Sequence, residues 1–164
     1  MANIQKKYIG LLGGSFDPAH KGHLGISKIA LKKLKLKKIY WVITKKNPFK
    51  NRTFYPLSER IKYSKKVANS HKNIKIIYLD NIIKSSRIID VINYFIKKKK
   101  IKNIFFIIGS DNLIRFHKWK SWKKIVKLVK LIVFSRKGYD RKGMKSIVVK
   151  NFKNKIIFIK NKHI

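Results

Sequence analysis

The chain contains no cysteine and few acidic residues, and each shortage excludes a class of function. Without cysteine, a disulfide scaffold, a cysteine-ligated zinc site and a thiol nucleophile are ruled out. Asp and Glu together number 6, too few for a dense carboxylate cluster that cages a metal. The apolar run at residues 8–12 is too short for a membrane span or for the apolar part of a signal peptide. We therefore expect a soluble, cytoplasmic protein that does not bind a membrane.

The length and the apolar content fit one folded domain. Hydrophobic residues make up 45% of the 164 positions. A domain of this size buries about two-thirds of the surface that its unfolded chain exposes, so it needs no covalent or metal cross-link. We expect residues 1–164 to form a single domain, and a homo-oligomer is compatible with the sequence.

Positive charge is what the chain has in excess, with a formal net charge of +37. Of the 43 basic residues only 6 are Arg, although base readout and bidentate phosphate binding favour Arg. The chain also holds 28 Ile, and the codons of Lys, Ile and Asn are all rich in A and T. We favour coding bias over selection for a polyanionic partner, and nucleic acid is not an expected ligand.

Short apolar segments alternate with amphipathic ones along the whole chain. Strands are predicted at residues 8–12, 39–43, 74–79, 104–108, 131–134 and 156–159, and helices at 22–36, 58–70, 88–98 and 119–127. The first strand is expected to stop at a Gly13-Gly14 turn, Ser58 to cap the second helix, and residues 138–143 to form a surface connection. Strands that are apolar throughout and alternate with helices predict an α/β fold with a doubly wound parallel sheet.

In such sheets ligands bind beyond the carboxyl ends of the strands, which draws attention to residues 13–23. Gly13 and Gly14 allow close approach of a phosphate to the backbone, and the helix that follows offers unpaired N–H groups. His20 and His23 fall on the opening turn of that helix and are expected to face one anion. Two other interpretations stay open: each histidine merely caps the helix, or the pair binds a metal, although no third ligand lies nearby.

Residues 13–23, GGSFDPAHKGH, resemble the signature of the nucleotidylyltransferase superfamily. The segment 107–113, IIGSDNL, with Phe116-His117-Lys118-Trp119 after it, is similar to the bacterial nicotinate-nucleotide adenylyltransferases. Residues 47–50, 58–60 and 133–139 fit the same family in order and spacing. The resemblance covers nearly the whole chain and implies a Rossmann-like fold of the nucleotidylyltransferase type.

The resemblance implies adenylyl transfer from ATP to nicotinate mononucleotide, giving deamido-NAD and pyrophosphate, with Mg²⁺ accompanying ATP. It assigns catalysis to His20, His23 and Lys50. It assigns ATP binding to Gly13, Gly14, Ser15, Phe16, His20, His23, Gly109, Asp111 and Arg136. It assigns acceptor binding to Asp17, Arg87, Ile88 and Trp119, with the Trp119 indole stacked on the nicotinate ring.

Several of these residues also have purely structural interpretations. Asp17 could only form a turn before Pro18, Asp111 could cap a helix, Trp119 could pack in the core, and Arg136 could be solvated. Trp122 is expected in the core.

The sequence departs from the family pattern in two places. A Tyr-Thr-x-x-Thr-Leu segment of the family corresponds here to residues 87–92, RIIDVI, so acceptor recognition is expected to use backbone N–H groups or Arg87. The family's Ile-Ser-Ser/Thr-x-x-Ile-Arg motif after the last strand has no counterpart before Ile164. We expect a domain shortened at its C-terminus, with fewer phosphate contacts.

Two other functions remain open from the sequence. The first keeps the superfamily and changes the acceptor to phosphopantetheine or nicotinamide mononucleotide. The second is a Lys-rich nucleic-acid-binding module that has lost catalysis, for which a gel shift with steep salt dependence is expected.

The charge excess makes a prediction about stability. Self-repulsion among 43 cations and 6 anions opposes the compact state, and salt at about 0.1 M screens charges beyond roughly 10 Å. The melting temperature, followed by circular dichroism, should therefore rise with moderate NaCl concentration. A flat salt series would contradict this expectation.

Overall fold

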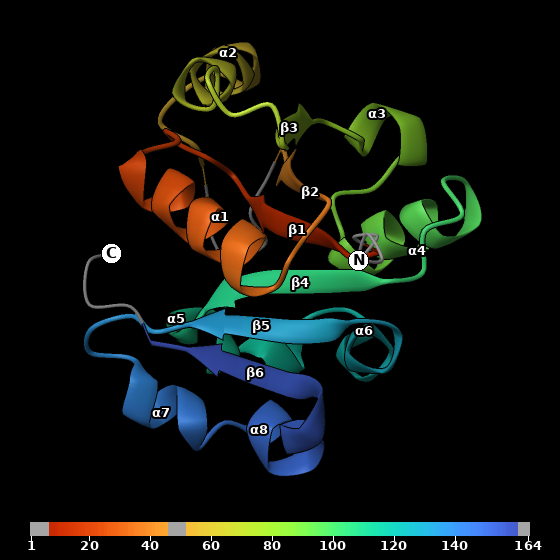
Figure 1. The fold of residues 1–164 in the computed structure, drawn as a ribbon. Coiled ribbons are helices and arrows are strands. Elements are labelled where there is room, and N and C mark those ends of the chain that lie inside the picture. The colour runs from red at the N-terminus through yellow and green to blue at the C-terminus, as the bar shows by residue number, and fades with distance from the viewer. Residues whose placement is uncertain (1–6, 46–51, 161–164) are drawn as a thin grey trace, which may run out of the picture. The chain divides into compact units, whose positions relative to one another are not determined.

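The computed structural model describes residues 7–45 and 52–160. Contacts divide the chain into two compact units, Met1–Tyr78 and Leu79–Ile164. Each unit has its own parallel strands and helices (Figure 1).

The first unit has three strands and two helices within its described residues. They are β1 (Ile9–Gly14), α1 (Lys21–Lys33), β2 (Lys38–Ile43), α2 (Leu57–Val67) and β3 (Ile74–Ile77). The strands run parallel in the order β3-β2-β1, with α1 packed against β2 and α2 against β3. Most of their apolar side chains are buried, Leu11, Ile39, Trp41 and Val42 completely, as expected of strands covered by helices.

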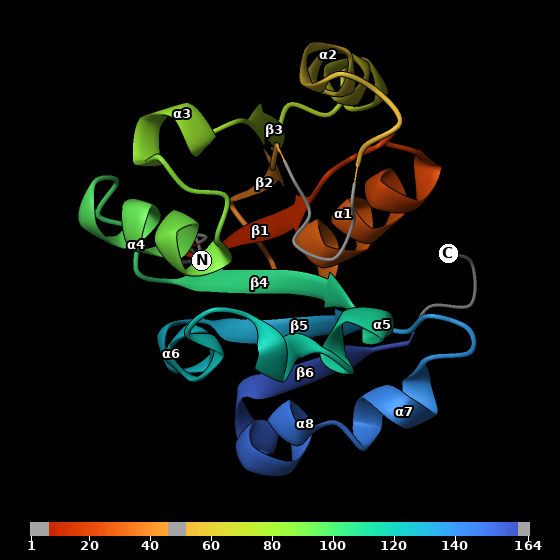
Figure 2. The same cartoon turned by 180° about the vertical axis from the view of Figure 1, so that it is seen from behind.

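The second unit also has three parallel strands, in the order β4-β5-β6. Its elements are α3 (Asp80–Ile83), α4 (Ile88–Lys97), β4 (Ile104–Gly109), α5 (Ser110–Leu113), the 3₁₀ helix η1 (Phe116–Lys118), α6 (Trp122–Leu128), β5 (Lys130–Phe134), α7 (Asp140–Met144), α8 (Ile147–Phe152), the 3₁₀ helix η2 (Lys153–Lys155) and β6 (Ile156–Ile159). Helices α5 and α6 lie on the same face of β5 (Figure 2). The predicted α/β architecture with parallel strands is confirmed.

In each unit, the register places the loops that follow neighbouring strands at the same end of those strands. In the first unit Gly14 pairs with Ile43, so β1 and β2 end side by side. In the second, Gly109 pairs with Phe134, which pairs with Ile159. Because the strands are parallel, the segments that follow β1 and β2 leave from the same end of these two strands, and so do the segments that follow β4 and β5 in the second unit.

Two predicted strand boundaries were wrong. The first strand continues through Gly13 and Gly14, which pair with Val42 and Ile43, and the chain turns only at Phe16, whose φ is 49°. The third strand ends at Ile77 rather than residue 79, because Leu79 is already the N-cap of α3.

Helix predictions failed where local backbone geometry decided the outcome. The helix expected at 119–127 begins only at Trp122, because Ser121 has a φ of 57° and interrupts the run. Residues 138–143 are not a plain surface connection, since α7 occupies part of them and buries Gly143. Helix α2 takes Pro56 as its N-cap, so Ser58 does not cap it.

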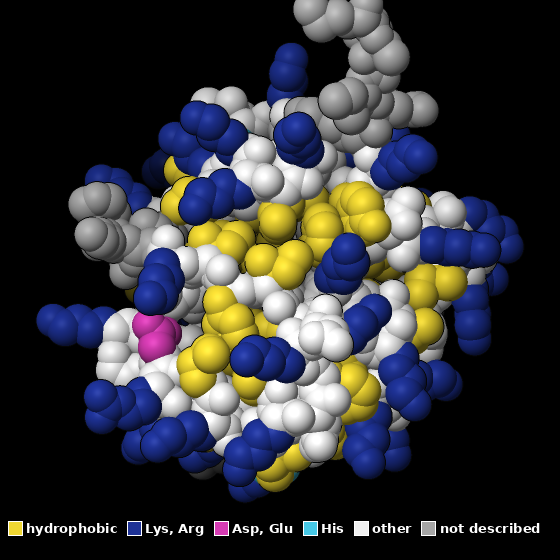
Figure 3. All heavy atoms as spheres, turned by 60° about the horizontal axis from the view of Figure 1, so that its bottom comes forward, with side chains coloured by type: hydrophobic (Ala, Val, Ile, Leu, Met, Phe, Trp, Pro, Cys, Tyr) yellow, Lys and Arg dark blue, Asp and Glu magenta, His cyan; other side chains and the backbone are white. Residues whose placement is uncertain are grey.

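Basic side chains are scattered over the surface. On the face in Figure 3, lysine and arginine side chains are spread over the whole view and form no single continuous stripe. Such a distribution is typical of a high overall lysine content rather than of a basic patch that binds one polyanionic partner. Within residues 7–45 and 52–160, no helix is both long and apolar enough to cross a membrane.

Candidate functional site

His20 and His23 hold the first turn of α1 through a reciprocal pair of hydrogen bonds. The backbone N–H of His20 donates to Nδ1 of His23 at 3.1 Å, and the N–H of Gly22 donates to Nδ1 of His20 at 3.0 Å. The two ring centroids are 4.1 Å apart. The prediction that both imidazoles sit together on the opening turn of this helix is confirmed, and so is the interpretation that they cap it.

These bonds fix the tautomer of both rings. A nitrogen that accepts a hydrogen bond carries no proton, so in each neutral imidazole the proton is on Nε2. Both histidines therefore present an N–H donor on the side of the ring away from the helix cap. Capping engages Nδ1 and is compatible with a second role for Nε2.

A buried aromatic stack supports the ring of His23. The ring of Phe16 lies 4.6 Å from that of His23 and stacks at 5.3 Å and 20° on Trp41. The indole Nε1 of Trp41 donates to Ser27 Oγ at 2.8 Å, and Ser27 Oγ donates to the carbonyl of His23 at 2.8 Å. Because Phe16 is only 2% exposed, its ring acts here as a support for His23, and its contact with ATP stays a prediction.

Arg60, on α2, is buried beneath the segments that follow β1 and β2. Its side chain is 2% exposed, and to the described residues its guanidinium donates four hydrogen bonds, all to backbone carbonyls. The acceptors are Ser15 at 2.7 Å, Thr44 at 2.9 Å, Tyr55 at 3.1 Å and Lys45 at 3.2 Å. Removing one partner of a buried hydrogen bond costs roughly 1–3 kcal/mol per orphaned group, so this cluster matters for the local backbone.

Asp17 works on the same part of the backbone. Its Oδ2 accepts from the N–H of Phe54 at 2.6 Å and its Oδ1 from the N–H of Tyr55 at 2.9 Å. The carboxylate thus does more than form a turn, and its role in acceptor binding stays a prediction. Lys50 lies outside the described residues.

In the second unit, Asp111 and Arg136 form an ion pair beyond β4. Nη1 of Arg136 donates to Oδ2 of Asp111 at 2.8 Å, while the Arg136 side chain remains 63% exposed. A Cβ on Gly109 would lie 2.6 Å from Oδ1 of Asp111, so only glycine leaves room for this carboxylate. Oδ1 is buried and has no hydrogen-bond partner among the described residues. The N-cap of α5 is Gly109, without a side-chain bond, so the interpretation of Asp111 as a helix cap was wrong.

The backbone of Arg136 is held from two sides. Its N–H donates to Oδ1 of Asp140 at 2.9 Å and to Oγ of Ser110 at 3.0 Å, and the hydroxyl of Ser135 donates to Oδ2 of Asp140. Hydrogen bonding from Ser110 and then from Ser135 lowers the pKa of Asp140, and burial opposes this effect. The Arg136 backbone bond and the charge of Lys160 lower the pKa further. The carboxylate form of Asp140 is therefore the one that this turn stabilises.

The residues predicted to bind the acceptor lie in the second unit, apart from Asp17. Trp119 is half-buried, with its ring 4.9 Å from Phe116 and 5.9 Å from Phe106, and its Nε1 is buried without a partner in the described part of the chain. Arg87 is the N-cap of α4 with an exposed side chain, and Ile88 is half-buried. Trp119 thus packs partly in the core, and stacking on a nicotinate ring stays a prediction. Trp122, expected in the core, is also only half-buried.

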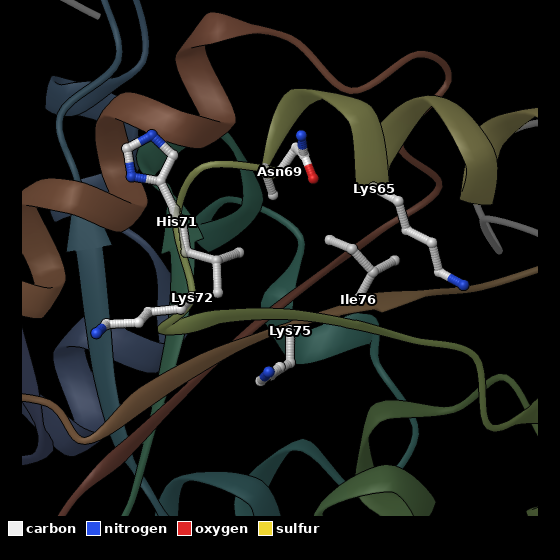
Figure 4. Close-up of a pocket in the computed structure, with 8 residues that line it drawn as sticks. Lys65, Asn69, His71, Lys72, Lys75 and Ile76 are labelled. Carbon is white, nitrogen blue, oxygen red and sulfur yellow. The ribbon is translucent and has the colours of Figure 1, made fainter.

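A basic pocket of about 430 Å³ lies elsewhere in the first unit, between α2 and β3 (Figure 4). It is lined by Lys65, Ala68, Asn69, His71, Lys72, Ile74, Lys75 and Ile76. These residues come from the C-terminal end of α2, from the connection at 68–73 and from β3, whereas the histidine pair follows the carboxyl end of β1. The pocket is therefore separate from the histidine site.

Comparison with known proteins places this chain in a family. A family model described as cytidylyltransferase-like matches residues 11–163. A probable nicotinate-nucleotide adenylyltransferase of Pelagibacter ubique is 50% identical over 163 residues, which cover 99% of this chain and 90% of the relative. The chain belongs to the nicotinate-nucleotide adenylyltransferase family. A probable nicotinate-nucleotide adenylyltransferase of Bradyrhizobium (strain ORS 278) is 40% identical over 113 residues, covering 68% of this chain and 58% of the relative.

Solved structures agree with the family at the level of the fold. The nicotinic acid mononucleotide adenylyltransferase of Plasmodium falciparum, complexed with NaAD, gives a TM-score of 0.74 at 18% identity, covering 96% of this chain and 77% of that one. At this identity the match bears on the fold alone. The predicted Rossmann-like fold and family are confirmed.

Sequence reasoning missed three residues that position this site in the adenylyltransferase fold. Arg60 was noted only as part of a family segment, and Ser27 and Trp41 only as members of a helix and a strand. The periodicity of α2 held a signal, because Arg60 shares its buried face with Ser64, one turn later. A charged residue on the buried face of an amphipathic helix requires internal partners.

The lowered pKa of Asp140 gives a signed prediction. A carboxyl whose pKa is lower in the folded state adds stability above its unfolded pKa, and that contribution is lost as pH falls through the folded value. Asp140→Asn should therefore destabilise the protein at neutral pH. The gap in melting temperature from the unmodified protein should close as pH falls below the ordinary pKa of an aspartate, about 3.9. A gap that stayed constant as the pH fell would show that Asp140 acts without its charge.

Proposed function

We propose that this protein transfers the adenylyl group of ATP to nicotinate mononucleotide, releasing pyrophosphate and forming deamido-NAD. The observation that carries the proposal is the histidine pair beyond β1, whose Nδ1 atoms are engaged in the helix cap so that both rings carry their proton on Nε2. Membership in the nicotinate-nucleotide adenylyltransferase family supports this choice of substrates.

In this reaction a phosphate oxygen of the mononucleotide attacks the α-phosphorus of ATP. A new P–O bond forms, the bond between the α-phosphorus and the bridging oxygen breaks, and its electron pair leaves with pyrophosphate. The attacking oxygen is already anionic, so no general base is required. Catalysis then consists of alignment and of stabilising the charge that spreads over the phosphate oxygens.

The first unit supplies directional donors for this charge. Nε2–H of His20 and of His23 would donate to phosphate oxygens, with His23 serving the transition state. The first turn of the 13-residue helix α1 adds the positive end of its dipole. The backbone of Gly13, Gly14 and Ser15 would complete the phosphate site, with Lys50 as a further positive charge.

The second unit would hold the nucleoside and the acceptor. The buried Oδ1 of Asp111 is suited to accept a ribose hydroxyl, since it has no partner among the described residues. The exposed guanidinium of Arg136, beyond Gly109, would meet adenine or a phosphate. Trp119 would stack on the nicotinate ring, and Arg87, next to Ile88, would pair with its carboxylate.

Mg²⁺ would accompany ATP and neutralise part of its charge. Across residues 7–45 and 52–160 no group of three or more His, Asp or Glu side chains could hold a metal. Phosphate oxygens and water would therefore supply most of its ligands, as is usual for this ion. The protein's own contribution remains the donors described above.

The proposal is tested by pyrophosphate release from ATP with three acceptors: nicotinate mononucleotide, nicotinamide mononucleotide and phosphopantetheine. We expect the highest kcat/KM with nicotinate mononucleotide, and a product with the mass of deamido-NAD. A preference for phosphopantetheine or nicotinamide mononucleotide would move the protein to another acceptor class. Absence of transfer with all three, together with salt-dependent binding to nucleic acid, would refute the proposal.

His23 offers the sharpest test of the mechanism. His23→Ala should lower kcat by about a hundredfold or more, the effect of removing one donor to a transition state. His23→Asn keeps an acceptor near the position of Nδ1 for the N–H of His20 but lacks Nε2, so it should preserve the helix cap and still lose activity.

The matched control is His71→Ala, because His71 is in the same unit and outside the proposed site. It should retain the kcat of the unmodified protein. Full activity in His23→Asn would remove Nε2 of His23 from the mechanism.

A further inference from the structure

We propose that Arg60 is a positioning residue for ATP binding: its buried guanidinium fixes the peptide after Ser15 and thereby the support of His23. This inference rests on the proposed function, and it adds a residue that need not touch the substrate.

Arg60 holds the backbone of several segments together, and we call this set of hydrogen bonds the clamp of Arg60. All four hydrogen bonds go to carbonyls, and these belong to three separate segments, at Ser15, at residues 44–45 and at Tyr55. Since the side chain is 2% exposed, water does not compete for these donors. One planar group therefore fixes the segments that leave the carboxyl ends of β1 and β2.

The bond to Ser15 passes its effect directly to His23. In a trans peptide the C=O and the next N–H point in opposite directions, so turning the Ser15 carbonyl toward Arg60 directs the N–H of Phe16 away from it. The next side chain is the Phe16 ring, which lies under His23 at 4.6 Å. A change at Arg60 would therefore reach His23 through two contacts, the hydrogen bond to the Ser15 carbonyl and the ring contact between Phe16 and His23.

The backbone of Tyr55 binds one acidic and one basic side chain. Its N–H donates to Asp17 and its carbonyl accepts from Arg60. The Asp17 carboxylate and the Arg60 guanidinium therefore bind the same residue, one at its N–H and the other at its carbonyl. Both hold the backbone near the proposed phosphate site. Loss of Arg60 would release both this residue and Ser15.

Lysine is not equivalent at this position. The chain uses Lys for 37 of its 43 basic residues, yet here it has Arg, whose planar fork presents five N–H donors in fixed directions. An ammonium has three donors around one atom and cannot reach acceptors on three segments with the same geometry. Arg60→Lys therefore keeps the charge and removes the clamp.

The experiment compares Arg60→Lys and Arg60→Met with Ser64→Ala. Ser64 is completely buried on the same helix and donates to the Arg60 carbonyl, so its loss disturbs the same packing and leaves the guanidinium in place. The readouts are the dissociation constant of a non-hydrolysable ATP analogue by calorimetry, and KM for ATP and for nicotinate mononucleotide.

Both Arg60 variants should raise KM for ATP and the analogue's dissociation constant by about tenfold or more, since several hydrogen bonds to the loop are lost. KM for nicotinate mononucleotide should change several-fold less than KM for ATP, because all of its proposed site except Asp17 is in the second unit. Ser64→Ala should keep the ATP affinity of the unmodified protein even where its melting temperature falls.

Rescue provides a readout that a general loss of packing would not give. Guanidinium ion added to Arg60→Ala should lower the dissociation constant of the ATP analogue, whereas NaCl at equal ionic strength should not. Equal effects of the two salts would contradict the proposal.

Three further results would overturn it. They are unchanged ATP affinity in folded Arg60→Lys, an equal loss of ATP affinity in Ser64→Ala, and failure of both Arg60 variants to fold even in stabilising sulfate, which would assign Arg60 to stability alone. Because analogue binding needs no acceptor, it is informative even if adenylyl transfer to nicotinate mononucleotide is absent.

Discussion

The reciprocal hydrogen bonds between His20, Gly22 and His23 are the constraint on which the site depends. A helix begins with N–H groups that have no partner within the helix, and here imidazole nitrogens accept from two backbone N–H groups around that first turn. Satisfying the backbone forces the remaining proton of each ring onto Nε2. Folding and chemistry are therefore coupled, since the donors that would meet a phosphate exist in this form only while the cap is intact.

Both units fix the backbone at a strand end with a polar side chain, and they do so with opposite chemistry. In the first unit Arg60 binds carbonyl oxygens, which turns the adjoining N–H groups the other way. In the second, Asp140 and Ser110 accept from the N–H of Arg136, while Asp111 holds its guanidinium. A loop that must receive a charged ligand has few apolar contacts to hold it, so hydrogen bonds from polar side chains to its backbone provide the rigidity.

Much of the fold followed from apolar periodicity, because six short apolar runs separated by amphipathic segments have few arrangements other than a parallel sheet. The histidine pair was also predictable, since its spacing alone puts both rings on one turn. The continuation of β1 through Gly13 and Gly14 was not, because it depends on pairing with β2. Nor was the clamp of Arg60, three of whose acceptors are backbone atoms 15 or more residues away in sequence, or the helix break at Ser121, which is set by one φ angle.

The net charge of +37 and the directional donors make different contributions to phosphate chemistry. A field from scattered lysines attracts any polyanion, is screened beyond about 10 Å at 0.1 M salt, and acts on the bound and activated states almost equally. Uniform attraction of that kind speeds encounter without lowering the barrier of the chemical step. Only donors at fixed positions can bind the charge of the in-line transition state better than that of ATP. In the proposed mechanism, this difference is the reason why so basic a protein would still need two imidazoles whose protons the helix cap has placed.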